Sequence, residues 1–288
     1  MRKIISLLTL CCIVLCFAGC GEKSGSTDIS NAKSIADLKG AKISAQTGTF
    51  HAEAAKQIEN VKCTTYPEFA DLLTALKSGA IDGYIAEEPT ALAECQADNS
   101  ITYLPLKNND NGFKTNKADT SIAVGLKTGS ALRDKINKIL SEIPEETKST
   151  LMEQMVKITA GEDIKEFALK SETPATTNGV LKVGMECAYR PFNWTETEAK
   201  TPGAVPISSA GNNGYANGYD VQMAQYIANK LGMKLEIYAI EWDSLLPALE
   251  SGTIDAIAAG MSPTVERENE IDFTDAYYES NLVVIIKK

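Results

Sequence analysis

The sequence predicts an α/β protein that consists of two similar lobes. Residues 68–86 and 241–259 follow one pattern, in which an amphipathic helix stops at a glycine and leads directly into a short apolar strand. Two copies of one helix–strand unit in a chain of this length indicate a pair of related lobes and not a solenoid. The chain has 288 residues and is 44% apolar, which is enough for two hydrophobic cores.

The two copies agree at several positions with one constant offset. The matching pairs are Leu72 with Leu245, Leu73 with Leu246, Leu76 with Leu249, Gly79 with Gly252, and Asp82 with Asp255. The segments that follow the copies differ in charge. Glu87 follows the first strand, whereas Ser262, Thr264 and Arg267 follow the second. Because ligands bind beyond the carboxyl ends of strands in open α/β sheets, we expect an anionic and a cationic end that together suit a zwitterion.

The segment from Ser251 to Arg267 carries the strongest chemical signal. Its short apolar run, Ile254 to Ala258, is bounded by glycines and predicts a buried strand. Arg267 offers the rigid fork of donors that matches a carboxylate in two parallel hydrogen bonds. The alternative is a helix that begins at Thr264, with Arg267 exposed to solvent in its first turn.

The amino terminus predicts export and a lipid anchor. A basic start precedes the apolar run Ile4 to Ala18, which is too short to span a membrane comfortably. We therefore expect residues 1–19 to be a signal peptide that is removed. The residues up to Cys20 resemble a bacterial lipoprotein box, so Cys20 is expected to carry the lipid. Residues 20–33 would then form a tether on the extracytoplasmic face of the cell membrane. The alternative is a plain signal peptide with an incidental cysteine.

Charge and residue content exclude several kinds of function. The net charge of −10 argues against nucleic-acid binding, which needs a basic surface. The cysteines beyond Cys20 have no metal-binding spacing, and we expect neither a metal nor a cofactor. The turn from Gln46 to Phe50 lacks the lysine and the length of a phosphate-binding loop, which disfavours nucleotides. The only histidine, His51, is expected in a helix cap or on the surface.

The remaining segments complete the two lobes in chain order. Residues 34–120 are predicted to form the N-terminal lobe and residues 180–288 the C-terminal lobe. Residues 159–179 are polar and unpatterned, which is typical of a linker. The other expected elements are strands over 43–45, 121–126, 181–185, 235–239 and 282–288, helices over 131–140, 148–157 and 218–232, and a surface loop over 195–217.

Five segments resemble the family 3 solute-binding proteins, the polar amino-acid receptors of ABC importers. They are Val183–Phe192, Gly218–Val221, Trp242–Leu249, Gly260–Arg267 and Asp272–Tyr278. The resemblance is greatest to the lipid-anchored receptors for glutamine and basic amino acids of Gram-positive bacteria, and it extends from residue 34 to residue 288. It implies a two-lobed periplasmic-binding-protein-like type II fold without a cofactor. It also implies a polar L-amino acid as ligand and an ABC permease in the membrane as partner.

The order of the two halves departs from that family. In the family, the half that resembles residues 183–278 precedes the half that resembles residues 39–89. The chain therefore resembles a circular permutation, in which residues 159–179 join the usual termini on one lobe. The alternative is a fragment of a longer tandem receptor.

The permuted order has consequences for the hinge between the lobes. It makes residues 121–158 a hinge strand with helices that return to the other lobe, and it ends the C-terminal lobe on a second hinge strand. We expect one covalently continuous crossing, near Ser121 to Gly125. In a monomer, which we expect, the other crossing forms when residues 282–288 dock near residues 30–36. The alternative is a domain-swapped dimer.

The resemblance also assigns the two charged ends of a bound amino acid. By its motif position, Arg267 would bind the ligand's carboxylate. Ser262, the Thr264 backbone and Thr49 would assist it. Glu87 would bind the ammonium group, where many relatives have aspartate.

The remaining ligand-binding residues follow from the same motifs. Gly260 would contribute a carbonyl group to the ammonium. Tyr189 and Trp242 would enclose the ligand's side chain. Glu186 and Gln46 lie where relatives distinguish ligands by that side chain, and glutamine or a basic amino acid is favoured. The alternative role of Glu186 is a structural hydrogen bond.

Together these observations predict a substrate-binding lipoprotein of an ABC importer, and not an enzyme. Two alternatives use the same scaffold. One is an enzyme similar to the cyclohexadienyl dehydratases, which would use an acid such as Glu87 or Glu186. The other is an amino-acid sensor that acts on a signalling partner.

Overall fold

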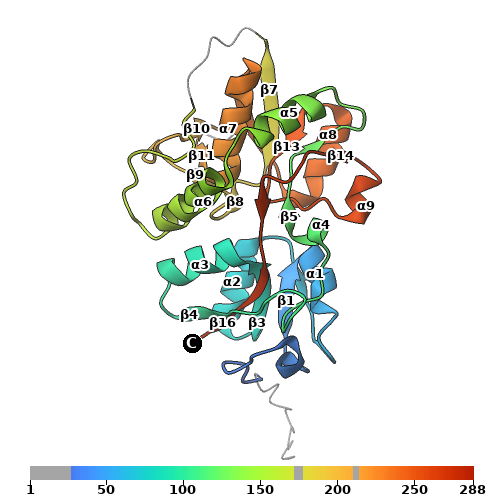
Figure 1. Ribbon diagram of the computed structural model, residues 1–288. Coiled ribbons are helices and arrows are strands. Elements are labelled where there is room, and N and C mark those ends of the chain that lie inside the picture. The colour runs from blue at the N-terminus through green and yellow to red at the C-terminus, as the bar shows by residue number, and fades with distance from the viewer. Residues whose placement is uncertain (1–26, 172–177, 210–213) are drawn as a thin grey trace, which may run out of the picture.

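The structure consists of two α/β lobes that are connected by two segments of the chain (Figure 1). It is a computed structural model, and it describes residues 27–171, 178–209 and 214–288. The predicted signal peptide and Cys20 lie outside the described residues. We call residues 27–116 with 282–288 the N-terminal lobe, and the described residues of 121–280 the C-terminal lobe.

The N-terminal lobe is built on a five-stranded sheet with the order β2-β1-β3-β16-β4. The first three strands are parallel, and β16 runs antiparallel to both of its neighbours. The strands are β1 (Ile43–Gln46), β2 (Thr65–Tyr66), β3 (Gly83–Glu87), β4 (Ile101–Leu104) and β16 (Leu282–Lys287). The helices are η1 (Ile35–Leu38), α1 (Phe50–Ala55), α2 (Phe69–Ser78) and α3 (Glu88–Ala97).

The last strand of the chain lies inside this first lobe. Residues 282–286 are apolar without alternation and are all buried, as expected for a strand that is covered on both faces. On one side β16 pairs with β3, and on the other with β4. Leu282, Val284 and Ile286 share a hydrophobic cluster with Ile29 and Leu38. The final strand is therefore a central part of the N-terminal core.

The C-terminal lobe contains a second five-stranded sheet with the order β12-β7-β13-β6-β14, and a smaller antiparallel sheet with the order β10-β11-β9-β8. Its strands are β6 (Gly125–Leu126), β7 (Val180–Met185), β8 (Ala188–Tyr189), β9 (Asn193–Glu196), β10 (Val205–Pro206), β11 (Tyr215–Asn217), β12 (Lys234–Ala239), β13 (Ala256–Ile257) and β14 (Asp272–Phe273). Its helices are α5 (Leu132–Ser141), α6 (Glu145–Thr159), α7 (Tyr219–Leu231), η2 (Trp242–Ser244), α8 (Leu245–Ser251) and α9 (Val265–Glu268). The expected surface loop over 195–217 is partly wrong, because β10 and β11 extend the small sheet there.

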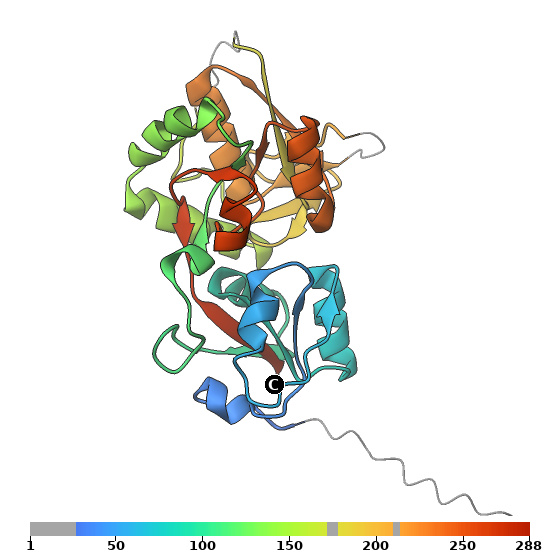
Figure 2. The same cartoon turned by 90° about the vertical axis from the view of Figure 1, so that its right-hand side faces the viewer.

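The chain passes between the lobes twice, through segments that lie side by side (Figures 1 and 2). The first segment contains α4 (Lys117–Thr120) and β5 (Ser121–Ile122), and the second contains β15 (Tyr278–Glu279). β5 and β15 form a two-stranded antiparallel sheet. The prediction of a single continuous crossing is wrong, because the chain continues from β15 into β16 and so returns to the N-terminal lobe.

The repeated helix–strand unit has the same local structure in both lobes. α2 ends at Gly79 with a φ of 77°, and α8 ends at Gly252 with a φ of 78°. This left-handed conformation favours glycine. Asp82 and Asp255 also have equal roles: Asp82 accepts a hydrogen bond of 2.9 Å from the backbone N–H of Lys42, just before β1, and Asp255 accepts one of 2.9 Å from that of Lys182 in β7. The predicted repeat is therefore confirmed.

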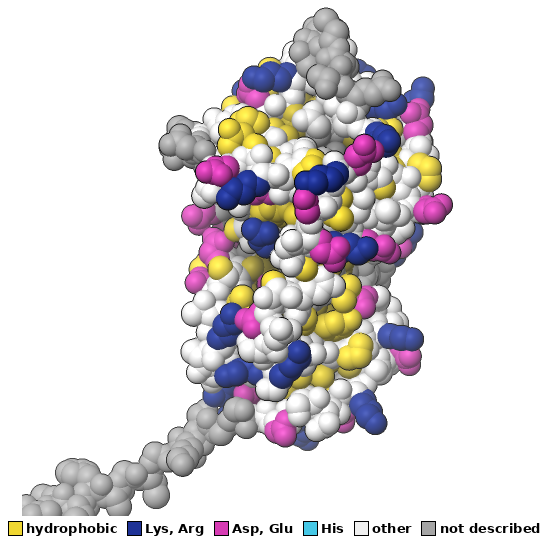
Figure 3. Space-filling model, turned by 90° about the vertical axis from the view of Figure 1, so that its left-hand side faces the viewer, with side chains coloured by type: hydrophobic (Ala, Val, Ile, Leu, Met, Phe, Trp, Pro, Cys, Tyr) yellow, Lys and Arg dark blue, Asp and Glu magenta, His cyan; other side chains and the backbone are white. Residues whose placement is uncertain are grey.

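The surface of the protein carries a mixture of charged and apolar side chains. On the face that Figure 3 shows, acidic and basic side chains are interspersed with apolar ones, and no large patch of lysine and arginine covers it. In the described part of the chain, no helix combines the length and the apolar character needed to cross a membrane. Cys63, Cys95 and Cys187 are free thiols.

Candidate ligand site between the lobes

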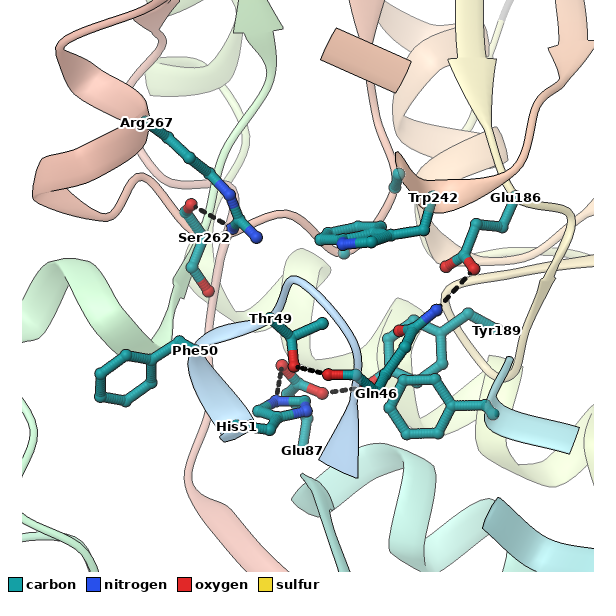
Figure 4. Close-up of a pocket in the computed structure, with 13 residues that line it drawn as sticks. Gln46, Thr49, Phe50, His51, Glu87, Glu186, Tyr189, Trp242, Ser262 and Arg267 are labelled. Atoms are coloured by element: carbon teal, nitrogen blue, oxygen red, sulfur yellow. Dashed lines mark hydrogen bonds and ion pairs between the residues drawn. The ribbon is translucent and has the colours of Figure 1, made fainter. Parts of the chain in front are cut away.

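A small cavity lies between the two lobes and is lined by both (Figure 4). The N-terminal lobe contributes the turn after β1, the start of α1 and the end of β3. The C-terminal lobe contributes the segments that follow β7 and β13, together with η2 and α9. The lining residues are Gln46, Thr49, Phe50, His51, Phe69, Glu87, Glu186, Tyr189, Trp242, Ala259, Gly260, Ser262 and Arg267.

Nine of the ten ligand-binding residues expected from the sequence line this one cavity. Thr264 does not, and it lies instead in a neighbouring groove together with Arg267. Thr264 is the N-cap residue of α9, and its backbone N–H donates to the carbonyl of Ser262 at 2.9 Å.

Arg267 is half-buried on α9 and points towards the N-terminal lobe. Its Nη1 donates to the Ser262 carbonyl at 2.9 Å, and its Nη2 donates to the Gly48 carbonyl of the other lobe at 3.1 Å. The guanidinium carbon lies 5.0 Å from the centre of the Trp242 ring. Burial lowers the pKa of Arg267 to about 10. Among the described residues no carboxylate forms an ion pair with Arg267, so its charge is balanced by carbonyl groups and a ring.

The Gly48 turn brings the lobes into close approach. Its carbonyl accepts a second hydrogen bond, from Trp242 Nε1 at 3.3 Å. Gly48 has a φ of 71°, and a Cβ atom there would lie 3.0 Å from Asp243 Oδ1. Both the left-handed conformation and the lack of space require glycine at this position.

Glu87 forms the anionic side of the cavity at the end of β3. It is buried, and its Oε1 lies 2.9 Å from His51 Nε2. Its Oε2 accepts a hydrogen bond from the hydroxyl of Tyr189, which belongs to the other lobe. The expectation of a cap or surface role for His51 is wrong: α1 buries this side chain, which is 5% exposed, against the carboxylate. Among the described residues His51 Nδ1 has no hydrogen-bond partner.

An aromatic stack joins the lobes beside Glu87. The Tyr189 ring lies 4.3 Å from the Phe69 ring of α2, with an angle of 25° between their planes. It also lies 5.2 Å from the Phe192 ring of its own lobe. Contacts of this kind add about 0.5–1.5 kcal/mol beyond the burial of area. Tyr189 therefore connects the lobes through both its hydroxyl and its ring.

Glu186 and Gln46 meet at another side of the cavity (Figure 4). Gln46 Nε2 donates to the Pro67 carbonyl at 3.0 Å and to Glu186 Oε1 at 2.7 Å. The pKa of Glu186 is raised to about 7: burial is the main cause, the hydrogen bond from Gln46 lowers the pKa, and the nearby carboxyl groups of Glu68, Asp243 and Glu241 add to the rise.

Asp220 is a buried carboxyl group that forms hydrogen bonds next to the cavity. This fully buried side chain accepts hydrogen bonds from the Tyr277 hydroxyl at 2.6 Å and from Asn193 Nδ2 at 2.8 Å. The backbone N–H of Gly260 is a third donor to it. Burial raises the pKa of Asp220 to about 6. Asp220 thus ties the Gly260 backbone in the cavity to Tyr277, which precedes the second crossing.

Sequence reasoning missed four lining residues, which are Phe50, His51, Phe69 and Ala259. Phe50 and His51 directly follow Thr49, so the start of α1 was the signal that could have found them. Ala259 precedes Gly260 in the same way. Phe69 lines the cavity from α2, where it stacks on Tyr189 of the other lobe. No feature of its own segment indicates this.

The two lobes and the charged cavity between them are typical of a protein that binds a small ligand. Two lobes enclose a small cavity with a guanidinium on one side and a buried carboxylate on another, which can bind a molecule that carries both charges. In the part of the chain that the structure describes, no group of three or more His, Cys, Asp or Glu side chains could hold a metal ion.

Comparisons with known proteins agree with this class. Residues 199–288 match the family model of the bacterial extracellular solute-binding proteins, family 3. The arginine-binding extracellular protein ArtP of Bacillus subtilis is 33% identical over 108 residues, which cover 38% of this chain and 36% of ArtP. A probable histidine-binding protein of Campylobacter jejuni is 37% identical over 114 residues, which cover 39% of this chain and 38% of that protein. In these segments the chain is similar to the family 3 solute-binding proteins.

The comparisons cover only part of each molecule. The chain matches less than two fifths of the length of these two relatives. Among solved structures, the ancestral amino-acid-binding protein AncCDT-1, described as a precursor of cyclohexadienyl dehydratase, is 33% identical over 34% of this chain and 36% of its own, with a TM-score of 0.27.

Proposed function

We propose that this chain binds one polar L-amino acid between its two lobes as the substrate-binding lipoprotein of an ABC importer. The observation that carries the proposal is that Arg267 of one lobe and Glu87 of the other line the same cavity. Arg267 would bind the carboxylate with Ser262 and Thr49 beside it, and Glu87 would bind the ammonium group with the Gly260 carbonyl. Neither lobe alone offers both charges, so the ligand favours the arrangement in which the lobes approach each other.

The remaining parts of the proposal extend it to the cell. Cys20 would carry the lipid that anchors the protein to the membrane, and an ABC permease would receive the ligand. The names of the relatives support binding in place of catalysis, since they are described as arginine-, histidine- and cystine-binding proteins. Glutamine and basic amino acids are the ligands that we favour, because Glu186 and Gln46 line the cavity near its acidic groups.

We also propose that the two halves are circularly permuted relative to the family and that the chain folds as a monomer. Two observations support this. β16, at the end of the chain, is a central strand in the sheet of the N-terminal lobe. Both crossings lie in one chain and pair with each other through β5 and β15. A domain swap would exchange β16 between two copies, and light scattering at several concentrations distinguishes the two states.

A thermal-shift screen tests the proposed function. The mature protein is heated with each of the twenty amino acids, and with ornithine, citrulline and cystine. A ligand at one hundred times its Kd stabilises the folded state by about 2.7 kcal/mol, which raises the melting temperature by several degrees. We expect a rise with one or a few polar L-amino acids and none with their D-enantiomers. The absence of a rise with every compound would contradict the proposed function.

A further inference from the structure

A second cavity, which we call the side groove, lies where the two lobes meet. The N-terminal lobe contributes α2 and α3 to it, and the C-terminal lobe contributes β8, β9 and the end of α6. α3 and α6 pack against each other across the lobe boundary (Figure 1). Phe69 and Tyr189 line both the side groove and the ligand cavity, so their stacked rings form a wall that the two share.

The walls of the side groove are largely apolar. Leu73 of α2 and Ala93 of α3 line it from the N-terminal lobe, and Ala188 and Trp194 line it from the C-terminal lobe. Figure 3 views the molecule from this side, where apolar side chains lie among charged ones. A small apolar group in the side groove would therefore contact both lobes at once.

Arg190 brings a positive charge without a counterion to the side groove. Its guanidinium carbon lies 5.0 Å from the centre of the Trp194 ring. In the described part of the chain, Arg133 forms ion pairs and Arg190 forms none. The carboxyl group of Glu196 has other partners, because its Oε1 accepts from Trp194 Nε1 at 3.1 Å and from the Thr201 hydroxyl at 2.6 Å. The Arg190 guanidinium is thus available to donate two parallel hydrogen bonds to a carboxylate.

The other charged groups of the side groove already have partners. Lys77 forms an ion pair with Asp98. Glu94 accepts a hydrogen bond from the hydroxyl of Tyr84. Burial raises the pKa of Glu94 to about 7, so this carboxyl carries only part of a negative charge at neutral pH. Among the described residues that line the side groove, Arg190 is therefore the charged group that lacks a partner.

We propose that the side groove binds an organic carboxylate with an apolar body, whose carboxylate pairs with Arg190 and whose body lies between α2 and Trp194. This site is separate from the ligand cavity, and its existence does not depend on the proposed function. Because the occupant contacts both lobes, it favours the arrangement in which they are close together. The same arrangement encloses the ligand cavity, so the occupant also raises the affinity for the amino acid. This second part rests on the proposed function.

Isothermal titration calorimetry with 3-phenylpropionate tests the site, and 3-phenylpropionamide is the matched neutral probe. We expect 3-phenylpropionate to bind with a Kd on the order of 1 mM. The amide should bind at least about tenfold more weakly, because it cannot form a charge-assisted pair with Arg190. No binding of the carboxylate at about 10 mM, or equal binding of the two probes, would overturn the proposal.

Two pairs of variants locate the site. Arg190→Ala should remove the preference for the carboxylate over the amide, whereas Arg133→Ala, on α5, should keep it. Leu73→Asp places a carboxylate in the wall on the other lobe and should abolish binding of 3-phenylpropionate. Thr74→Asp, at the next and exposed position of α2, should bind as the wild type does. Circular dichroism shows whether each variant is folded. A folded Arg190→Ala that keeps the preference for the carboxylate would overturn the proposal.

The effect on the ligand cavity is measured with the amino acid found in the thermal-shift screen. Saturating 3-phenylpropionate should lower the Kd of that amino acid about fivefold in the wild type and leave it unchanged in Arg190→Ala. A higher Kd would mean that the probe competes for the ligand cavity, which would overturn the side groove as its site. An unchanged Kd in the wild type would overturn the coupling. If no amino acid binds, the proposed function fails, and the titrations of 3-phenylpropionate still decide whether the side groove is a site.

Discussion

Replacement of Asp220 by alanine tests how firmly the C-terminal lobe holds the Gly260 backbone in place. The Asp220 carboxyl is buried and accepts from Tyr277, Asn193 and Gly260. The substitution leaves these three buried donors without their acceptor, at about 1–3 kcal/mol each. We therefore expect the free energy of unfolding to fall by about 3–5 kcal/mol near pH 5, where the carboxyl is mostly protonated.

The pH dependence of this loss is a sharper test than its size. The pKa of Asp220 in the folded protein is about 6, above the ordinary 3.8. Because the folded pKa is raised, the stability that the protonated carboxyl contributes is present in full below pH 3.8 and is lost as the pH rises through 6. The difference between wild type and Asp220→Ala should thus be about 1 kcal/mol larger at pH 5 than at pH 7.

Urea unfolding followed by circular dichroism at the two pH values provides the measurement. Other titrating groups are common to both proteins and cancel in the difference. Tyr277→Phe is the matched control: it keeps the carboxyl, removes one of its donors, and should cost only about 1 kcal/mol. A loss below about 1 kcal/mol for Asp220→Ala, or a loss that grows towards pH 7, would refute the reasoning.

Two further predictions concern the cavity and the fold. Glu87→Gln removes the charge but keeps groups that can form hydrogen bonds to His51 and Tyr189. Calorimetry with the amino acid found in the screen should therefore show an affinity lower by about 2–5 kcal/mol. The control is Glu88→Gln, at the next position on α3, which should bind as the wild type does. Gly218→Ala should lower the urea midpoint strongly, because Gly218 has a φ of 129° and its Cβ would lie 2.3 Å from the Phe192 carbonyl oxygen. Gly40→Ala, with a φ of 74° and no atom within 4 Å of its Cβ, should cost only about 1–2 kcal/mol, and equal losses in the two variants would contradict the steric explanation.

Much of the fold could be predicted because the repeated residues have the same roles in both copies. Leu72 and Leu245 form cores, Gly79 and Gly252 end helices, and Asp82 and Asp255 tie a strand to its neighbour. The glycines end helices through residues nearby in the chain, whereas the two aspartates bond to backbone groups 40 and 73 residues away, at the same place in each copy of the repeat. The predicted bounds of β7 and α7 differ from the structure by one residue at most.

The sequence also contains the information that places β16 inside a sheet. The unbroken apolar run of residues 282–286 is typical of a strand buried on both faces, which is the place it has between β3 and β4. The expectation that residues 282–288 dock near residues 30–36 did not include their place between β3 and β4. Two continuous crossings follow once β16 is a central strand of the N-terminal sheet.

The candidate site could be predicted from the sequence where its residues belong to motifs. Glu87 and Arg267 follow the two repeated strands, and the structure brings both to one cavity. The contacts that couple the lobes could not be read in the same way. Tyr189 reaches Glu87 and Phe69 from the other lobe, and His51 lies against Glu87 because α1 packs beside β3. The Tyr189 contacts depend on how the lobes meet, and the His51 contact depends on how α1 packs within its own lobe; neither can be read from the segments alone.

Calorimetry of Arg267→Ala with the amino acid found in the screen is the most direct test of the central claim, that a zwitterion is held between Arg267 and Glu87. Loss of the guanidinium leaves the ligand's carboxylate without its partner, and the affinity should fall by about 2–5 kcal/mol. Arg133→Ala, which removes an exposed guanidinium on α5, should bind with the wild-type affinity. Binding of the ligand to Arg267→Ala with an unchanged Kd would contradict the account.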